Sequence, residues 1–518
     1  MKKSILASSI AAAVFGLGAV TGAQAQSGDF LLVPYFSAQG ANATLLSIVN
    51  TDTVNGKAVK VRFRGAANSD DLFDFQVFLS PADVFTANIA KGADGRAVFT
   101  TTDASCTKPA ASTLNTTPFL TSRLDPALST DAKANGTREG YVEIINMADI
   151  PPKRTASGAA STLLETLVAG VVTPATNSPN PLFTAIKHVK SVAPCSGSAF
   201  TALDAAAALS GGTTPAATYG MTPGTGRLMA NWTIVNTTNA AAFGGEATEI
   251  AFADRPTAVI YAPQIGGAAP TIANYSADPL FLTSADAQKF GSTAIASAAV
   301  TAGMYDLPDL STSVLGVNTP AGTAAQIAGI TSQLVSSRIS NEFAVESAIN
   351  GSTDWVFSMP TRRYHVAMAY GQIATGDDGR RFNTLLQGTS GAGYAVFPKT
   401  GTSLVGGLIC VDLSTITPYD REENTPVSST ATVVSPSTVA GGAKLCGETS
   451  VMSFNNGVGT TKALEASVAV TSIDVGYAAG WATMANTFPI IGGAFHRAAF
   501  GAQGFGIYRD HRFTGLPN

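Results

Sequence analysis

Residues that could carry out catalysis are few in this sequence and lie far apart. An α/β-hydrolase exposes its serine nucleophile on a G-x-S-x-G turn, and the sequence contains no such motif. The pattern places three histidines on strands and one in a short helix; they are His365, His496 and His511, and His188. We expect structural or surface roles for them, because a catalytic histidine works with a neighbouring nucleophile or acid.

Acidic residues gather in three stretches that could supply paired carboxyls or oxygen ligands. They are Asp70, Asp71 and Asp74, then Asp377 and Asp378, then Glu422 and Glu423. A glycosidase needs two carboxyls across a sugar cleft, and sequence spacing does not show one. The arginines in GDDGRR and YDREEN favour ion-paired, solvated loops instead. Calcium is the one cofactor left open, although EF-hand and glycine-rich nonapeptide loops are absent. No catalytic, cofactor-binding or metal-binding residue is assigned.

Three tryptophans stand in expected strands: Trp232, Trp355 and Trp481. Exposed aromatic rings could form a platform on which a sugar stacks. A tryptophan in a strand is more commonly the buried anchor of a sheet, and we expect that role here.

The first residues have the pattern of a secretory signal peptide. Two lysines precede an uncharged run from Ile5 to Val20, and Ala23 and Ala25 occupy the −3 and −1 positions of a cleavage site before Gln26. A membrane-spanning helix is the alternative, but the run is short and rich in Gly and Ser. No other stretch has the ~18 uninterrupted apolar residues that a spanning helix needs. We therefore expect an exported mature chain that begins at Gln26 and has no transmembrane helix.

Four cysteines in an oxidising compartment favour disulfides. They are Cys106, Cys195, Cys410 and Cys446, and three pairings exist. We favour Cys106–Cys195 and Cys410–Cys446, because each pair brackets a segment rich in Ser, Thr, Pro and Ala. A zinc site is not expected, since no two cysteines have C-x-x-C spacing.

Strands are indicated by alternating apolar and polar residues. In TLLSIVNTDTVNGKAVKVRFRG (44–65), a turn-rich stretch separates two such runs, which predicts a hairpin. In its second run three apolar residues alternate with three cations: Val59, Val61 and Phe63 with Lys60, Arg62 and Arg64. This pattern predicts one face on a core and a cationic face in water.

A similar pattern returns in NWTIVNTTNAAAFGGEATEIAF (231–252), where the letters IVNT recur. It suggests a duplicated hairpin, with chance identity as the alternative. DLFDFQVFLSP (71–81) predicts a strand with Phe73, Phe75, Val77 and Leu79 on one face, and GYVEIINM (140–147) predicts another. Helical spacing occurs in STLLETLVAGVV (161–172) and over 324–337.

These elements predict a mainly β protein with two or more β-sandwich-like regions and low-complexity or short helical inserts. We expect a signal peptide at 1–25 and an N-terminal β-rich domain at 26–262 with an insert at about 106–223. An Ala/Ser/Thr/Gly-rich insert with a helix follows at 263–340, and a C-terminal β-rich domain at 341–518.

Charge and composition limit the partners. Charged residues are 13% of the chain, against about 25% in ordinary soluble domains, and the formal net charge is −4. Such a chain has no electrostatic footprint for nucleic acid. Its 51 glycines and abundant Ala, Ser and Thr favour a protein whose surface packs against other surfaces.

Several stretches resemble a family of exported, largely uncharacterised proteobacterial proteins, some of them labelled cell-surface or surface-layer proteins. The stretches are LLVPYFSAQGANATLLSIVNTDTVNGKAVKVRFR, DFQVFLSPADVFTA, GYVEIINMADI, NEFAVESAINGSTDWVFSMPTRR, PYDREEN and FPIIGGAFHR. They lie between Leu31 and Arg497. The resemblance implies a location at the surface of a Gram-negative envelope, and it assigns no catalytic residue.

Three functions are compatible with the sequence. The first is an exported, non-enzymatic structural protein of the cell surface that self-associates into a layer or filament, or binds other envelope components. The second is a secreted hydrolase of polysaccharide or peptide, which needs two acids or a Ser–His pair in one cleft. The third is an outer-membrane β-barrel, which needs strands of about 10 residues with an unbroken apolar row.

Overall fold

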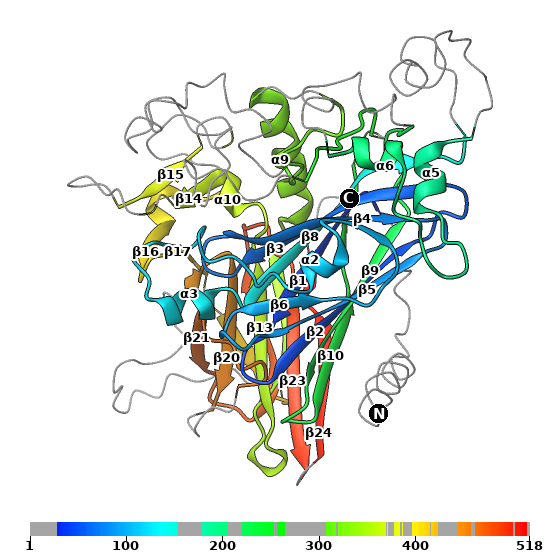
Figure 1. The fold of residues 1–518 in the computed structure, drawn as a ribbon. Coiled ribbons are helices and arrows are strands. Elements are labelled where there is room, and N and C mark those ends of the chain that lie inside the picture. Colours follow the sequence, from blue (N-terminus) through cyan, green and yellow to red (C-terminus); the bar gives the residue numbers. More distant parts are fainter. Residues whose placement is uncertain are drawn as a thin grey trace, which may run out of the picture.

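The computed structural model is built from layered sheets (Figure 1). It describes residues 28–153, 179–204, 220–252, 254, 256–264, 307–316, 320–368, 370, 378–383, 386, 396–414, 416–422, 444–456, 462–500 and 503–514. The predicted cleavage site between Ala25 and Gln26 and the expected helix in 161–172 lie outside these residues. Within them the protein is mainly β, with several antiparallel sheets, which confirms the predicted fold class.

Two sheets form a sandwich in the first half of the chain. In spatial order, the six-stranded sheet contains β11 (Thr248–Ile250), β1 (Phe30–Ser37), β8 (Glu139–Ile150), β3 (Gly56–Gly65), β4 (Asp71–Leu79) and β7 (Cys106–Lys108). The five-stranded sheet contains β10 (Ala241–Glu246), β9 (Leu228–Asn236), β2 (Asn42–Asn50), β5 (Val84–Lys91) and β6 (Ala97–Thr100). The apolar face predicted for β4 is buried between them, where Phe73 stacks on Phe119 with ring centroids 4.9 Å apart.

The predicted hairpin at 44–65 is wrong. β2 pairs with β5 and β9 in the five-stranded sheet, whereas β3 pairs with β4 and β8 in the six-stranded sheet. The connection from Thr51 to Asn55 therefore crosses from one sheet to the other. The later stretch also changes sheets, since β9 and β10 form a hairpin and β11 pairs with β1. A turn-rich linker between two alternating runs has the same sequence pattern in either arrangement.

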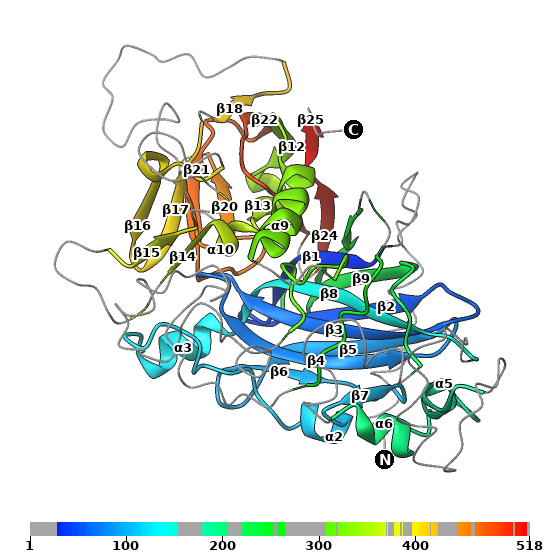
Figure 2. The ribbon, with the colours of Figure 1, turned by 90° about the horizontal axis from the view of Figure 1, so that it is seen from above.

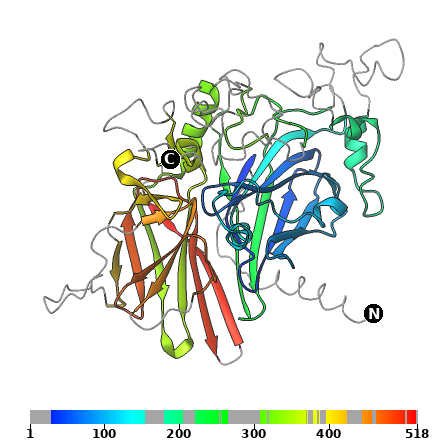
Figure 3. The ribbon, with the colours of Figure 1, turned by 60° about the vertical axis from the view of Figure 1, so that its left-hand side comes forward.

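A second sandwich follows in the other half (Figure 3). Its four-stranded sheet contains β18 (Ile416–Tyr419), β22 (Ala479–Ala485), β12 (Arg338–Ala344) and β25 (Arg512–Thr514). Its five-stranded sheet contains β21 (Val470–Asp474), β20 (Thr449–Asn455), β13 (Ser352–Ser358), β23 (Gly493–Phe500) and β24 (Gln503–Asp510). Two small sheets flank it: β14 (Val366–Met368) with β15 (Arg380–Phe382), and β16 (Thr402–Val405), β17 (Leu408–Asp412) and β19 (Lys444–Cys446). Trp355, Phe357 and Met452 lie in its core.

The two sandwiches share a buried interface. The ring centroid of Phe495 in β23 lies 5.8 Å from that of Trp232 in β9 and 5.4 Å from that of Phe243 in β10. Strand β24 lies against β10, where the glycine at position 504 leaves room for the carbonyl oxygen of Asn239. The hydroxyl of Ser358 donates to the carbonyl of Pro34 across the same junction, at 2.5 Å. The core of the first sandwich therefore extends to one face of the second, where Val356, Val451 and Phe495 belong to it.

Helices cover the outer face of the six-stranded sheet. Within the described residues the helices are α2 (Ala111–Leu114), α3 (Thr130–Gly136), α5 (Pro181–Ile186), α6 (Ser198–Ala202), α9 (Pro320–Leu334) and α10 (Arg362–His365), with the 3-10 turns η5 (Ser347–Ile349) and η6 (Lys399–Gly401). The helix predicted over 324–337 is α9. It begins earlier, with a proline at its first position, and it ends earlier because Val335 bridges to Pro489. Ile327, Ile330 and Leu334 belong to one buried cluster with the outward-facing side chains of β1 and β8. Figure 2 shows α9 beside these strands.

Both favoured disulfides are present. Cys106 of β7 is bonded to Cys195, with Cα atoms 5.2 Å apart, and Cys410 of β17 is bonded to Cys446 of β19. They close loops with sequence separations of 89 and 36 residues. In the loop-entropy model these closures stabilise the folded protein by about 4.6 and about 4 kcal/mol, respectively.

Candidate functional site

The cationic face of β3 is buried, which contradicts the expectation that it lies in water. Lys60, Arg62 and Arg64 have exposed fractions of 0%, 2% and 2%. The face is covered by residues 256–264 and 307–316, by α9 and by α10 (Figure 1). Alternation along β3 correctly separates two faces, but the second face meets protein from elsewhere in the chain. Buried charges of this number require partners.

The partners lie first on the two neighbouring strands. In the register of the sheet, Arg62 is opposite Asp74 of β4 on one side and Glu143 of β8 on the other. Directly opposed residues share a face, so acids and bases alternate across three strands. Lys60 pairs with Asp74 and also donates to Gln264 at 2.8 Å.

Arg64 and Glu143 form a two-point contact. Nε and Nη2 of Arg64 donate to Oε1 and Oε2 of Glu143 at 3.3 and 3.4 Å. Nε of Arg62 lies 3.3 Å from Oδ2 of Asp71, and Nη1 of Arg64 lies 4.0 Å from the same oxygen. The fork of the guanidinium matches a carboxylate in this geometry, which favours arginine over lysine.

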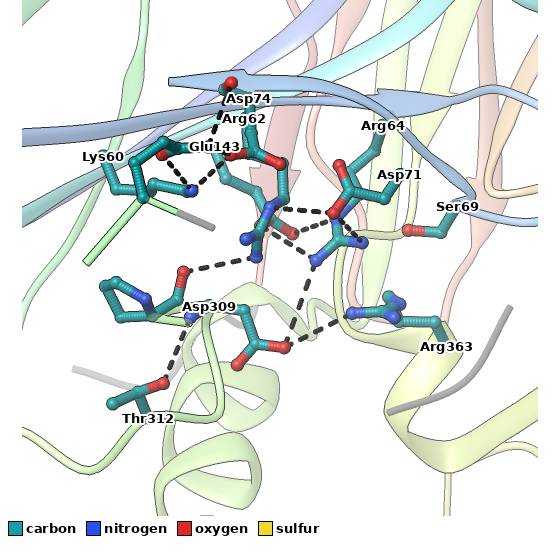
Figure 4. Close-up of polar contacts among 12 residues, drawn as sticks. Lys60, Arg62, Arg64, Ser69, Asp71, Asp74, Glu143, Asp309, Thr312 and Arg363 are labelled. Carbon is teal, nitrogen blue, oxygen red and sulfur yellow. Dashed lines mark hydrogen bonds and ion pairs between the residues drawn. The ribbon is translucent and has the colours of Figure 1, made fainter. Parts of the chain in front are cut away.

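Asp309 connects this face to the second half of the chain. Its Oδ2 lies 4.0 Å from Nη2 of Arg64 and 3.4 Å from Nη1 of Arg363 in α10 (Figure 4). Its Oδ1 accepts from the backbone amide and the hydroxyl of Ser311, at 2.9 and 2.7 Å. Arg62 donates to the carbonyl of the neighbouring Pro308 at 3.2 Å. One carboxylate thus links β3 with α10.

The carboxylate of Glu448, from the second sandwich, also contacts α10. Oε2 of Glu448 lies 2.7 Å from Nη2 of Arg362, and its Oε1 accepts from the backbone amide of Arg363 at 3.1 Å. The backbone amide of Glu448 in turn donates to the carbonyl of Ala66, just after β3, at 2.8 Å. We call this set the buried charge network: Lys60, Arg62, Arg64, Asp71, Asp74, Glu143, Asp309, Arg362, Arg363 and Glu448.

The acids of the network raise the pKa of Arg62, Arg64 and Arg363 and so keep them charged. Burial acts to lower the pKa of Arg64, but Glu143 and Asp71 outweigh it and raise that pKa well above its usual value. Burial acts to raise the pKa of Asp309, and the charges of Arg363, Arg62 and Arg64 lower it overall. Glu448 differs, because burial outweighs Arg362 and leaves its pKa raised.

Tyrosines border the network. The hydroxyl of Tyr370 donates to Oδ2 of Asp70 at 2.8 Å, and the hydroxyls of Tyr141 and Ser69 are 2.6 Å apart. Burial raises the pKa of Asp70 to about 7, although the Tyr370 hydrogen bond opposes the rise. Asp70 is therefore the acid beside the network whose ionisation changes near neutral pH.

The four histidines are separate from one another. His365 is the last residue of helix α10, whereas the sequence placed it on a strand. It is buried, and its Nε2 lies 3.0 Å from the hydroxyl of Thr331. His188 follows α5, and its Nδ1 lies 3.1 Å from Oγ of Ser80. His496 is in β23 as expected, whereas His511 lies between β24 and β25. Burial lowers the pKa of His365 and of His511 to about 3, so both are neutral at physiological pH.

The three acidic stretches also have different surroundings. Asp70, Asp71 and Asp74 are at the network, whereas Asp378 forms an ion pair with Arg380 at 2.5 Å and Glu422 is exposed. Asp377 and Glu423 are not among the described residues. No group of three or more His, Cys, Asp or Glu side chains in the described part of the chain is arranged to hold a metal ion. The calcium hypothesis therefore gains no specific ligand set.

The tryptophans divide into two groups. Trp232 and Trp355 are buried anchors, as expected. Trp481 is 41% exposed and stacks on Tyr419, with ring centroids 4.4 Å apart and ring planes 12° from parallel. The expectation of burial is wrong for Trp481, because it lies on the outer face of the four-stranded sheet.

The chain matches no protein-family model, no curated protein and no solved structure. None of the helices that the structure describes is long and apolar enough to span a membrane. The geometry of the described residues is therefore the basis for a functional assignment.

Sequence reasoning missed the buried charge network, although part of its signal is visible. The cations of β3 have acidic counterparts in β4 and β8, the strands that flank it. Complementary charges at alternating positions of three neighbouring strands indicate a buried polar layer. Asp309, Arg363 and Glu448 carry no such local signal, because their approach depends on the tertiary fold.

Proposed function

We propose that this protein is an exported structural protein of the cell surface that associates with copies of itself. The observation that carries the proposal is the buried charge network. Its acids and bases are directed at one another and join the first sandwich, residues 307–316 and the second sandwich. The buried charge network resists rearrangement of these parts, because moving one charged partner away would leave the other buried without compensation.

Other features of the chain support export and a location at the cell surface. The described cysteines are all in disulfides, which persist in oxidising compartments. The sequence pattern at the start of the chain and the resemblance to surface proteins favour the same location. A low content of charged side chains suits close contact between protein surfaces.

Strand β24 offers the surface for self-association. It is an edge strand whose residues alternate: glycines at positions 504 and 506 face β10, while Phe505 and Ile507 are 54% and 53% exposed. The exposed ring of Phe500 lies next to Phe505, with centroids 6.0 Å apart. An edge strand with an exposed apolar row is a template for pairing with another chain. The occupant that we propose is β24 of a second copy.

The location is tested by adding a protease to intact exporting cells and to cells with a permeabilised outer envelope. Cleavage on intact cells, with a periplasmic marker protein left whole, is the expected result. Protection until the envelope is opened would refute a surface location.

Self-association is tested by sedimentation of the purified protein over a range of concentrations. We expect oligomers that Phe505→Asp and Ile507→Asp dissociate. Val189→Asp is the matched control, because Val189 is 60% exposed but lies between α5 and α6, away from β24. A wild-type protein that stays monomeric at high concentration, or variants that associate like it, would contradict this interface.

A further inference from the structure

We propose that the outer face of the four-stranded sheet binds a polysaccharide, with the exposed ring of Trp481 as the surface on which a sugar ring packs and Tyr419 as the residue that holds the Trp481 ring in place. Trp481 of β22 is directly opposite Tyr419 of β18, so both rings project from one face. The two rings are stacked on each other, so Tyr419 supports one face of Trp481 and fixes its orientation. On the other side of Trp481, the directly opposed residue is Glu342 of β12.

The row continues into a charged pair. The side chain of Glu342 is 56% exposed, and its Oε2 lies 3.6 Å from Nε of Arg509, which is 51% exposed. An aromatic pair and a carboxylate therefore follow one another across the sheet, and the guanidinium of Arg509 approaches the carboxylate from β24 of the neighbouring sheet. A pyranose has a flat face of C–H groups that packs on aromatic rings, and hydroxyls at its edge that bond to carboxylates and guanidinium groups.

A second row of polar side chains runs beside the first. Thr417 and Ser340 are both opposite Thr483, and Arg512 of β25 is opposite Ser340. The hydroxyl of Ser340 donates to Oγ1 of Thr483 at 2.9 Å. Thr483 is buried and satisfied within the protein, whereas Thr417, Ser340 and Arg512 are at least partly exposed and extend the supply of hydrogen-bonding groups beside the first row.

The composition of this face favours a sugar over an apolar partner. Among the described residues, Trp481 is the exposed large apolar side chain of these four strands. Its neighbours are hydroxyl-bearing and charged, whereas an apolar protein contact would surround it with aliphatic residues. The face also differs from the outer face of the six-stranded sheet, which α9 and residues 307–316 cover.

The polysaccharide that we propose is that of the exporting cell's own envelope, and this choice of source rests on the proposed function. Attachment through Trp481 would hold the protein at the surface, and β24 would remain available for a second copy. Trp481, Tyr419 and Glu342 belong to a different sheet of the second sandwich from β24, and of this row Arg509 alone is in β24 itself.

The test uses purified protein and immobilised polysaccharide extracted from the exporting cells, with cellulose and chitin as unrelated probes. We expect binding to the envelope polysaccharide that Trp481→Ala and Tyr419→Ala each weaken about tenfold, or about 1.4 kcal/mol. Val189→Ala is the matched control, because it removes another exposed apolar side chain, lies outside both proposed surfaces and should leave the affinity unchanged. Thermal melting of each variant shows that it is folded.

A second measurement uses the wild-type protein alone. Trp481 is exposed while Trp232 and Trp355 are buried, so acrylamide quenching of fluorescence reports mainly on Trp481. Added envelope polysaccharide should protect it, and the Trp481→Phe variant should lose this signal while it keeps most of its affinity.

No binding to the envelope polysaccharide, binding to cellulose or chitin alone, or equal affinity in Trp481→Ala would overturn the inference. The assay contains no cells, so its outcome is independent of the proteolysis experiment. A protein that is shielded in intact cells but binds through Trp481 would refute the surface location and retain the site.

Discussion

Arg64 and Glu143 face each other from adjacent strands, joined by two hydrogen bonds of 3.3 and 3.4 Å, and both side chains are buried. A contact of this kind is common in binding sites that recognise carboxylates. Here both partners belong to the protein, and their neighbours Asp309 and Arg363 extend the contact into the second half of the chain. The pair therefore stabilises the arrangement of the sandwiches.

Replacement of Glu143 by glutamine should destabilise the protein by about 3–5 kcal/mol, because it leaves Arg64 buried beside a neutral group. The measurement is the free energy of unfolding in urea. Glu346→Gln is the control: its 2.8 Å pair with Arg421 is at the surface, where such pairs contribute about 0–1 kcal/mol. The double variant Arg64→Met/Glu143→Leu should recover much of the loss. A loss below 1 kcal/mol for Glu143→Gln would count against the structural role of the network.

Asp70 should make stability depend on pH. Its folded pKa of about 7 exceeds the unfolded value of about 3.9. The folded state therefore holds its proton more tightly, so ionisation of Asp70 lowers the free energy of unfolding by up to about 1.4 kcal/mol per pH unit between about pH 4 and pH 7. Below that range Asp70 contributes no pH dependence to the free energy of unfolding. Above that range the loss of stability caused by its ionisation no longer grows with pH.

Asp70→Asn should remove this penalty, so the variant is more stable than the wild type at pH 8 and similar to it at pH 4. Urea unfolding at both pH values measures the difference. Asp94→Asn should give no gain at pH 8, because the Asp94 carboxylate is exposed beside Arg96 and its pKa is lowered by hydrogen bonds from Arg96. A wild type that is the more stable protein at pH 8 would refute the assignment.

Gly504→Ala should weaken the junction of the sandwiches. A Cβ atom at this position would lie 1.9 Å from the carbonyl oxygen of Asn239, and backbone cannot move aside as a flexible side chain does. We expect a loss of about 1–3 kcal/mol in thermal or urea unfolding. Gly329→Ala in α9 is the matched control, since it meets no atom within 4 Å and should gain about 0.5–1 kcal/mol. Equal effects at the two positions would show that β10 and β24 do not touch.

Loss of the Cys106–Cys195 disulfide should cost about 4.6 kcal/mol, because it closes the longer loop. The Cys106→Ser/Cys195→Ser variant is compared with Cys410→Ser/Cys446→Ser by urea unfolding without reductant. The second variant should lose slightly less, in keeping with its 36-residue separation. A non-reducing peptide map that shows any other pairing would disprove both assignments.

The sequence allowed the strand faces and the disulfide pairs to be predicted, but not the surroundings of each face. In β4, alternation correctly identifies Phe73, Phe75 and Val77 as core residues. In β3 the same alternation identifies two faces, and the assumption that cations face water is wrong. Periodicity reports which side chains lie together; it does not report what covers them.

Long-range pairing limited the remaining predictions. The runs at 44–65 look like a hairpin because a turn-rich linker joins them, yet β2 finds its partner in β9, far along the chain. Trp481 was expected to be buried because a strand position alone does not distinguish an inner from an outer face. The stacked pair with Tyr419 depends on the register of β18 and β22, which no local pattern specifies.

The covered face of β3 has a consequence for how the molecule folds. Arg62 is separated by 246 residues from Pro308, and Asp70 by 300 from Tyr370. The first sandwich pairs the cations of β3 with acids of β4 and β8, but it cannot cover this layer until the remote segments arrive, so an early fragment would expose these ion pairs to water. Contacts between such distant positions form slowly, and the two halves should mature and melt together as a single cooperative unit.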